Sequence, residues 1–446
     1  MKLIRLDNRI LAVLMVALLA VGVAAGYELE SSGGTTKVST ESIVSTTASV
    51  STATSVSTTT IAQPTTETTT RTTTVRVTEP APGEIPSITT IEEGNITIEG
   101  YPNTVAVNYL TGMLYITDIF SNVLTIVNGT TDSVTAAITM PATPTGIVVD
   151  SSTNTVFVSI GNCTNVIDAS NSCDSTQSVT TPPEIFAMNG STNRVFWTIR
   201  VNAIAVAVDE GRGVLYATQG QMAGPVSNST GSLLAVSASS GLLMANISLD
   251  AYPGGVALDS RTHTLYVSAC PVVGIACEGA EVLVINATNS VILTKIPVPG
   301  WGFSGMILDT FTSTGYLVVY SNVTKLVSIN LNSDKEVYST VLGSTCADIS
   351  LLGIDLFKGQ LYAVASGGQP TSDLLLVISA ETGDIVNMFS APGQIVGFTP
   401  GYNGLFYSTI ESLSPHQTSG SLVSLSESFP TGFVNTGLIA SGVCLP

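Results

Sequence analysis

Short apolar runs rich in β-branched residues recur along the chain from about residue 95 to its C-terminus. In Gly254–Pro299, four such runs are separated by polar turns: Val256–Asp259, Leu265–Ala269, Val282–Asn286 and a last run that begins at Val291. Alternating β-branched residues bounded by turn residues predict strands joined into hairpins. The segment therefore predicts one antiparallel unit of four strands.

Six other segments follow the same plan. The first run recurs with its start at Val105, Ile147, Val206, Met306, Leu352 and Val396. A four-stranded unit that recurs every ~40–50 residues is typical of propeller blades, whose sheets bury their faces against each other. We expect an all-β fold, with seven four-stranded blades across residues 95–446. We expect Asn95-Ile-Thr-Ile-Glu99 to close the ring as the outer strand of the last blade.

The N-terminal region has a different pattern. Lys2, Arg5 and Arg9 precede an uninterrupted apolar run, Ile10–Ala25, which predicts an exported chain with either a cleaved signal (residues 1–26) or a helical membrane anchor. Residues 27–94 are dominated by Ser and Thr, which predicts a disordered, O-glycosylated stalk. A stalk can hold the ring at a distance from the cell only when its N-terminal end is attached to the membrane, which favours the anchor over the cleaved signal.

Composition limits the partners. The chain has 14 Lys and Arg against 32 Asp and Glu, and its net charge is −18. An acidic surface repels nucleic acid and anionic membrane faces, so neither is an expected partner. The hydrophobic fraction of 44% is ample for a packed core.

Repeated motifs point to a known family. LYVS at Leu265, VAVD at Val206 and the step Pro253-Gly-Gly-Val-Ala-Leu resemble the YVTN family of β-propeller repeats. The resemblance covers the chain from about Tyr101 onward and implies a surface protein of archaeal or bacterial type without a shared catalytic set. The fifth and seventh units depart from the pattern, because GYLVVY replaces LYVS and Thr399 replaces the Asp.

Acceptor sites for N-glycosylation and cysteines support an extracellular location. The sequons begin at Asn95, Asn128, Asn162, Asn189, Asn228, Asn246, Asn286 and Asn322. The cysteines are Cys163, Cys173, Cys270, Cys277, Cys346 and Cys444. The first four predict two local disulfides, Cys163 with Cys173 and Cys270 with Cys277, and the last two pair only by elimination. With two His in the chain, no metal site is expected, although Asp168, Asp174, Glu184 and Glu278 leave a weak possibility of Ca²⁺.

The long connections fall between second and third strands, and in a propeller these emerge on one face. They are Gly161–Pro183, Gln219–Gly231, Ala269–Ala280, Ser366–Ser372 and Ile410–Gly420. Insertions confined to one face of a repeat array are typical of a binding side, and neutral insertion is the alternative. Tyr101, Tyr252 and Trp301 precede first strands on that face. They are the candidate contact residues, or they fill gaps between blades.

Catalytic signatures are absent from the sequence. Asp150, Asp209, Asp259, Asp309 and Asp355 follow the blade period, and an Asp that ends a strand typically caps a turn. His263 and His416 are expected on opposite faces, which disfavours a His-based site. We therefore expect an extracellular module that binds an envelope protein or glycan. A binding module is favoured over an enzyme. A polysaccharide lyase or hydrolase with carboxylates at the mouth, and a structural part of the surface lattice, are the alternatives.

Overall fold

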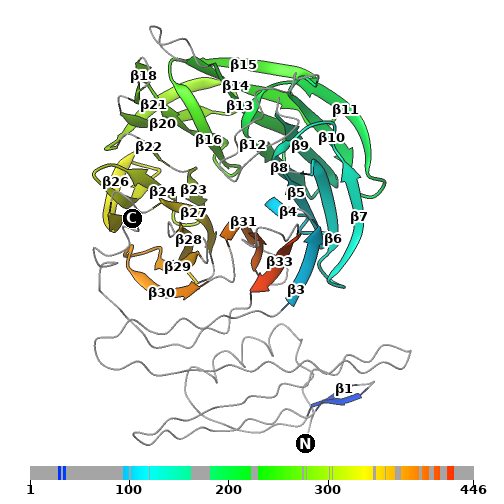
Figure 1. Ribbon diagram of the computed structural model, residues 1–446. Coiled ribbons are helices and arrows are strands. Elements are labelled where there is room, and N and C mark those ends of the chain that lie inside the picture. Colours follow the sequence, from blue (N-terminus) through cyan, green and yellow to red (C-terminus); the bar gives the residue numbers. More distant parts are fainter. Residues whose placement is uncertain are drawn as a thin grey trace, which may run out of the picture. The chain divides into compact units, whose positions relative to one another are not determined.

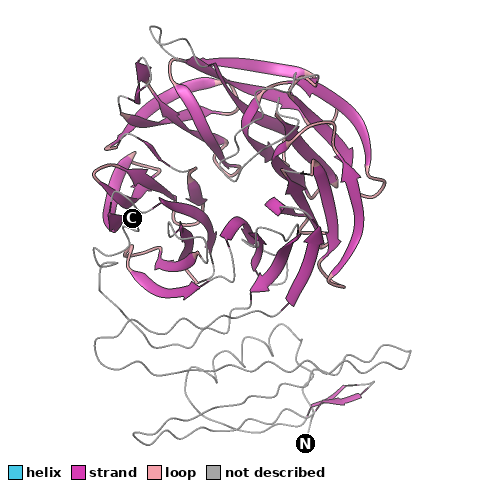
Figure 2. Cartoon of the chain, viewed as in Figure 1, coloured by secondary structure: helices cyan, strands magenta, loops and turns pink. Residues whose placement is uncertain are grey.

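The computed structural model describes residues 29–31, 34–36, 94–99, 102–119, 121–161, 181–221, 230–273, 276–277, 279–300, 302–303, 305–344, 348–356, 358–366, 373–390, 394–400, 406–411 and 419–425. The chain divides into two compact units, Met1–Ala53 and Thr54–Pro446. In the first, β1 (Leu29–Ser31) pairs with β2 (Gly34–Thr36), so these six residues of the predicted disordered stalk form a hairpin. Within the described ranges there is no helix, and hence none that is apolar and long enough to cross a membrane (Figure 2). The predicted N-terminal helix lies outside these ranges.

The second unit contains antiparallel sheets arranged in a ring (Figure 1). Each blade starts with an innermost strand that contacts the innermost strands of the two neighbouring sheets. The first three blades each contain four strands that are consecutive in sequence. Blade 1 contains β4 (Pro102–Val107), β5 (Met113–Asp118), β6 (Val123–Asn128) and β7 (Ser133–Thr139). Blade 2 contains β8 (Pro144–Asp150), β9 (Thr155–Ile160), β10 (Glu184–Asn189) and β11 (Arg194–Arg200). Blade 3 contains β12 (Ala203–Asp209), β13 (Val214–Gln221), β14 (Thr230–Ser237) and β15 (Leu243–Leu249).

Blade 4 carries a small hairpin between its second and third strands. Its strands are β16 (Tyr252–Asp259), β17 (Thr264–Cys270), β20 (Ala280–Asn286) and β21 (Val291–Val298), and the hairpin consists of β18 (Val272–Val273) and β19 (Ala276–Cys277). Blade 5 contains β27 (Asp348–Asp355), β28 (Gln360–Ser366), β29 (Leu374–Ser379) and β30 (Ile385–Ser390). Blade 6 contains β31 (Gln394–Pro400), β32 (Phe406–Glu411), β33 (Ser419–Leu425) and β3 (Gly94–Glu99).

The expectation of seven four-stranded blades is wrong. Six blades have four strands each, and the sheet between blades 4 and 5 has five: β22 (Gly302–Phe303), β23 (Ile307–Asp309), β24 (Thr314–Tyr320), β25 (Val323–Asn330) and β26 (Lys335–Ser344). Both β22 and β23 pair with β24, so the innermost strand of this sheet is divided in two. The repeat period locates this unit but does not distinguish a continuous strand from a divided one.

The predicted ring closure is confirmed. Strand β3 pairs antiparallel with β33 over its full length, from Gly94 opposite Ser424 to Glu99 opposite Ser419. Its Ile98 is 1% exposed and packs with Leu422 of the same blade and with Val105 and Leu114 of blade 1. The first and the last described strands of the ring, β3 and β33, therefore share one sheet (Figure 1).

Neighbouring sheets are held together by apolar clusters and, in the first three blades, by an aromatic residue of the second strand. Tyr115, Phe157 and Tyr216 are at most 1% exposed. The hydroxyl of Tyr115 donates to the carbonyl oxygen of Gly190 in blade 2 at 3.4 Å, and that of Tyr216 donates to Ala287 in blade 4 at the same distance. These side chains fill the seams, which are the spaces between neighbouring sheets, because each sheet can bury its faces only against the adjacent sheets of the ring.

Candidate binding surface

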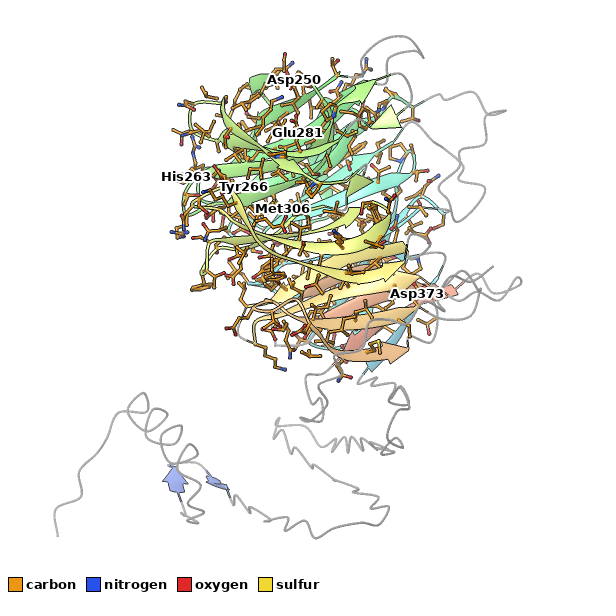
Figure 3. All side chains as sticks on the ribbon, turned by 90° about the vertical axis from the view of Figure 1, so that its left-hand side faces the viewer. Asp250, His263, Tyr266, Glu281, Met306 and Asp373 are labelled. Carbon is orange, nitrogen blue, oxygen red and sulfur yellow. The ribbon has the colours of Figure 1, made fainter. Side chains whose placement is uncertain are left out.

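The ring has two faces, which we name by their connections. The turn face carries the first-to-second and third-to-fourth turns, and the loop face carries the second-to-third and fourth-to-first connections. Figure 3 views the ring from its edge, with His263 toward one face and Asp373 toward the other. Of the long connections, residues 162–180, 222–229, 367–372 and 412–418 lie outside the described ranges. In Ala269–Ala280, β18 and β19 form a hairpin on the loop face.

Of the three candidate contact aromatics, only Tyr252 is described. It is the first residue of β16 and lies opposite Cys270 of β17. Its ring packs so closely against Gly220 of blade 3 that a Cβ at Gly220 would lie within 2.4 Å of the ring. Tyr252 thus fills the seam between blades 3 and 4 while it remains partly exposed on the loop face. Tyr101 and Trp301 lie outside the described ranges, and a contact role for all three stays a prediction.

The cysteines lie mostly beyond the described side chains. Cys270 is in a disulfide, and it ends β17 next to the β18–β19 hairpin that contains Cys277. The partner's side chain is not described, so the pairing of Cys270 with Cys277 stays a prediction. Cys163, Cys173, Cys346 and Cys444 fall outside the described ranges.

An ionic cluster joins blades 3 and 4 on the loop face. The ammonium of Lys295 in β21 lies 2.7 and 2.8 Å from the two carboxylate oxygens of Asp250 and 3.2 Å from Glu281 Oε1. The hydrogen bond from Lys295 lowers the pKa of Asp250, and the same bond raises the pKa of Lys295. The ion pair links β21 to the connection between β15 and β16, which leads directly into Tyr252.

The periodic aspartates cap turns, as the sequence predicts. Each ends a first strand, is at most 6% exposed and accepts a backbone N–H two or three residues ahead. Asp259 Oδ1, for example, accepts from Arg261 N at 3.0 Å and Thr262 N at 3.3 Å. In blade 1, Asn108 makes the same contacts with Leu110 N and Thr111 N. These carboxylates lie at the turn face, away from the predicted binding side.

The turn face also joins neighbouring sheets through polar contacts that the sequence did not reveal. Arg212 of blade 3 donates to Ala287 O of blade 4 at 3.0 Å, and Arg261 of blade 4 donates to Ser313 Oγ of the five-stranded sheet at 3.1 Å. His263 Nδ1 lies 3.7 Å from Asp209 Oδ2 across the seam between blades 3 and 4. Arg212, Arg261 and His263 follow the aspartate of their own blade by two to four residues, at no constant offset, so the sequence offers no periodic signal for these contacts.

Three predicted glycosylation sites occupy equivalent positions. Asn128, Asn189 and Asn286 end the third strands of blades 1, 2 and 4. In each, Oδ1 accepts the backbone N–H of the hydroxyl residue two positions later, at 2.9, 3.0 and 2.8 Å respectively. Asn246 is exposed within β15, and Asn322 is exposed beside β25. The side chain of Asn95 and residues Asn162 and Asn228 are not described.

Sequence reasoning missed two sets of exposed apolar side chains. Four lie in first-to-second turns: Tyr109, Leu110, Phe311 and Leu356. Eight lie near the start of outer strands, where a β-bulge in each strand interrupts the alternation of buried and exposed side chains. They are Val134, Val195, Phe196, Leu243, Met244, Val291, Leu293 and Val337. The bulges were not visible in the sequence pattern.

Of the four acidic residues considered for Ca²⁺, only Glu184 is described. Among described residues, no group of three or more His, Cys, Asp or Glu could hold a metal ion. Glu184, one of the four residues considered for Ca²⁺, instead pairs with Arg200 at 3.5 Å. Asp168, Asp174 and Glu278 lie outside the described ranges, as does His416.

Comparisons with known proteins do not place the chain in a family. No family model and no curated protein matches the chain. The resemblance to YVTN repeats therefore stays an interpretation of the motifs.

Proposed function

We propose that the chain is an exported surface protein whose propeller binds an envelope component, or the surface of another cell, through its loop face. The observation that carries this proposal is the asymmetry between the two faces. Residues 151–154 join β8 to β9 on the turn face, whereas residues 161–183 join β9 to β10 on the loop face. A β-propeller fold commonly serves protein interactions, and insertions on one face of a repeat array are typical of its binding side.

Export is supported by the N-terminal sequence and the sequons. A positively charged start, an apolar run and a Ser/Thr-rich segment precede the ring. The chain enters the ring at Gly94, which lies opposite Ser424 at the turn-face end of β33. A membrane anchor before that point favours an orientation in which the loop face points away from the cell.

The partner's chemistry follows from the charge and the contacts. A net charge of −18 disfavours polyanions. On the described part of the loop face, the ammonium of Lys295 is already engaged by two carboxylates. This surface suits an uncharged glycan or a protein, bound by hydrogen bonds and by the partly exposed ring of Tyr252.

Co-sedimentation of the purified full-length protein with isolated cell envelopes tests the proposal. We expect saturable pelleting that is lost when residues 270–278 are replaced by a short Gly-Ser turn. Phe311→Ser, at an 86% exposed position of the turn face, is the matched control and should pellet like the wild type. Absence of pelleting would overturn the proposal, and so would equal pelleting of the loop variant. Release of sugar from envelope polysaccharide would favour the enzyme instead, and concentration-dependent assembly of the protein alone would favour a lattice component.

A further inference from the structure

The outer strands of blades 1 to 4 expose large apolar side chains in a belt around the ring. We define the outer belt as Val134, Val195, Phe196, Leu243, Met244, Val291 and Leu293. All are about half exposed or more, from 46% at Val195 to 61% at Met244. In blades 2, 3 and 4 two such side chains lie within three residues of each other, so the exposure is more than the scattered single residues that need no explanation.

The belt arises from a repeated backbone feature. In each of these outer strands one extra residue is inserted opposite the third strand, for instance Phe196 between Val195 and Trp197, which pair with Met188 and Ala187. Met244 and Leu293 are the extra residues of β15 and β21. A bulge turns its extra side chain away from the regular alternation, so these side chains are not buried against a neighbouring blade.

Each blade that contributes to the belt has a sequon in the same outer hairpin. Asn286 lies directly opposite Val291, Asn128 lies opposite Ser133 just before Val134, and Asn189 lies opposite Arg194 just before Val195. Cβ atoms of directly opposed residues are about 5 Å apart, and neighbours along a strand are about 3.3 Å apart. Asn286 thus shares its face of the sheet with Val291, whereas Asn128 and Asn189 lie one residue out of step with Val134 and Val195, so their glycans reach these side chains around the exposed end of the hairpin.

Blades 3 and 5 support the association between sequons and exposed apolar side chains in the outer hairpins. Blade 3 ends its third strand with Ser237, which is no acceptor, but it has Asn246 two residues after Met244 on the outer strand itself. Blade 5 has no sequon in its outer hairpin, and its equivalent residues Ile385 and Val386 are only partly exposed. The five-stranded sheet is an exception, because its outer hairpin, β25–β26, exposes Val337 but contains no sequon.

The turn geometry leaves the acceptor nitrogen available. Oδ1 of Asn128, Asn189 and Asn286 is held by backbone N–H groups, and Nδ2 of these three residues makes no hydrogen bond with a described residue. A glycan on Nδ2 leaves the carbonyl oxygen intact, so the turn keeps its cap after modification.

We propose that N-linked glycans on Asn128, Asn189, Asn246 and Asn286 fold back over the outer belt. Nδ2 attacks the anomeric carbon of a lipid-linked oligosaccharide phosphate, the carbon–oxygen bond to phosphate breaks, and one Nδ2 proton leaves with the phosphate. The C–H faces of the first sugar rings then pack against Val, Leu, Met and Phe side chains, which removes apolar surface from water. This inference rests on the export part of the proposed function and not on the identity of the loop-face partner.

Hydroxyl-radical footprinting with mass spectrometry tests this proposal. Full-length protein from a host that glycosylates Asn-x-Ser/Thr is compared with the variant Thr130→Val, Ser191→Ala, Ser248→Ala, Thr288→Val, which removes the four sequons and keeps every asparagine cap. We expect occupied sites in the wild type and several-fold slower oxidation of Met244 and Phe196 than in the variant. Phe311, which lies in a first-to-second turn and not in an outer hairpin, should oxidise equally in both.

Two further comparisons separate glycan effects from folding effects. Both proteins made in a host without N-glycosylation should show the same fast oxidation of Met244, because the substitutions themselves leave the fold intact. Unoccupied asparagines in protein recovered from its own cell surface would overturn the proposal. Occupied asparagines with unprotected Met244 and Phe196 would also overturn it, while leaving the export and loop-face binding of the proposed function standing.

Discussion

The hydroxyl of Thr218 offers the sharpest stability prediction. Thr218 lies in β13 and is 0% exposed. Its Oγ1 accepts from Ala205 N of the same blade at 3.1 Å and donates to Gly254 O of blade 4 at 2.9 Å. Ala205 lies at the bulge of β12, where the ladder with β13 shifts register. One buried hydroxyl thus serves backbone groups of two blades.

Thr218→Val keeps the shape of the side chain and removes both hydrogen bonds. Each of the two buried backbone groups left without a partner costs about 1–3 kcal/mol, so we expect a loss of roughly 2–6 kcal/mol in the free energy of unfolding. A ring of this size unfolds with an entropy on the order of 0.7 kcal/mol/K, which converts the loss to a Tm lower by about 3–9 °C.

Thermal unfolding followed by circular dichroism measures this shift. Thr198→Val in outer strand β11 is the control, because Thr198 is exposed and its change should stay within ~0.5 kcal/mol. Equal Tm values for Thr218→Val and Thr198→Val would refute the reasoning, since the bulge would then not depend on the hydroxyl.

Three further predictions concern turn caps and titrating groups. Asp259→Asn should be nearly neutral, because Asn108 caps the equivalent turn of blade 1, whereas Asp259→Ala should cost about 1–2 kcal/mol in denaturant unfolding. Burial raises the pKa of Tyr266 to about 12 from 10.0. The stability that the buried neutral phenol contributes is therefore fully present below pH 10 and is lost as pH rises toward 12, because the unfolded chain ionises first. Phenylalanine does not ionise, so Tyr266→Phe should be more stable than the wild type by about 2–3 kcal/mol at pH 12. The lowered pKa of Asp250 means that the Lys295 cluster stabilises the fold above pH 3.8 and is lost as pH falls through the lower value; Lys295→Met should return the pKa toward 3.8 in a carboxyl NMR titration.

Much of the fold could be predicted from the sequence because blade strands have a clear period. The approximate position of each first strand, the turn caps and the closure by Asn95–Glu99 follow from local patterns, although the first strands of the four-stranded blades begin two to four residues before the predicted starts, for example at Tyr252 instead of Val256. The division of one inner strand into β22 and β23 could not be predicted, since the apolar pattern around Phe303 and Ile307 resembles that of a continuous strand.

The candidate surface was less accessible to sequence reasoning. The pattern placed Tyr252 at the loop face, but only the structure shows that its ring packs against Gly220 in the seam between blades. The outer belt could not be predicted because a bulge interrupts the alternation that identifies exposed positions: Phe196 and Met244 are the extra residues of two bulges and lie exposed in the structure. Side-chain direction at a bulge depends on tertiary pairing, which periodicity does not encode.

Amide hydrogen exchange of the full-length protein, with and without saturating cell envelopes, tests the central claim most directly. The account predicts slower exchange at the loop face, in residues 270–280 and in the start of β16 at Tyr252, and unchanged exchange in the turns after Asp209 and Asp259. Protection confined to the turn face, or no protection on either face, would contradict binding through the loop face.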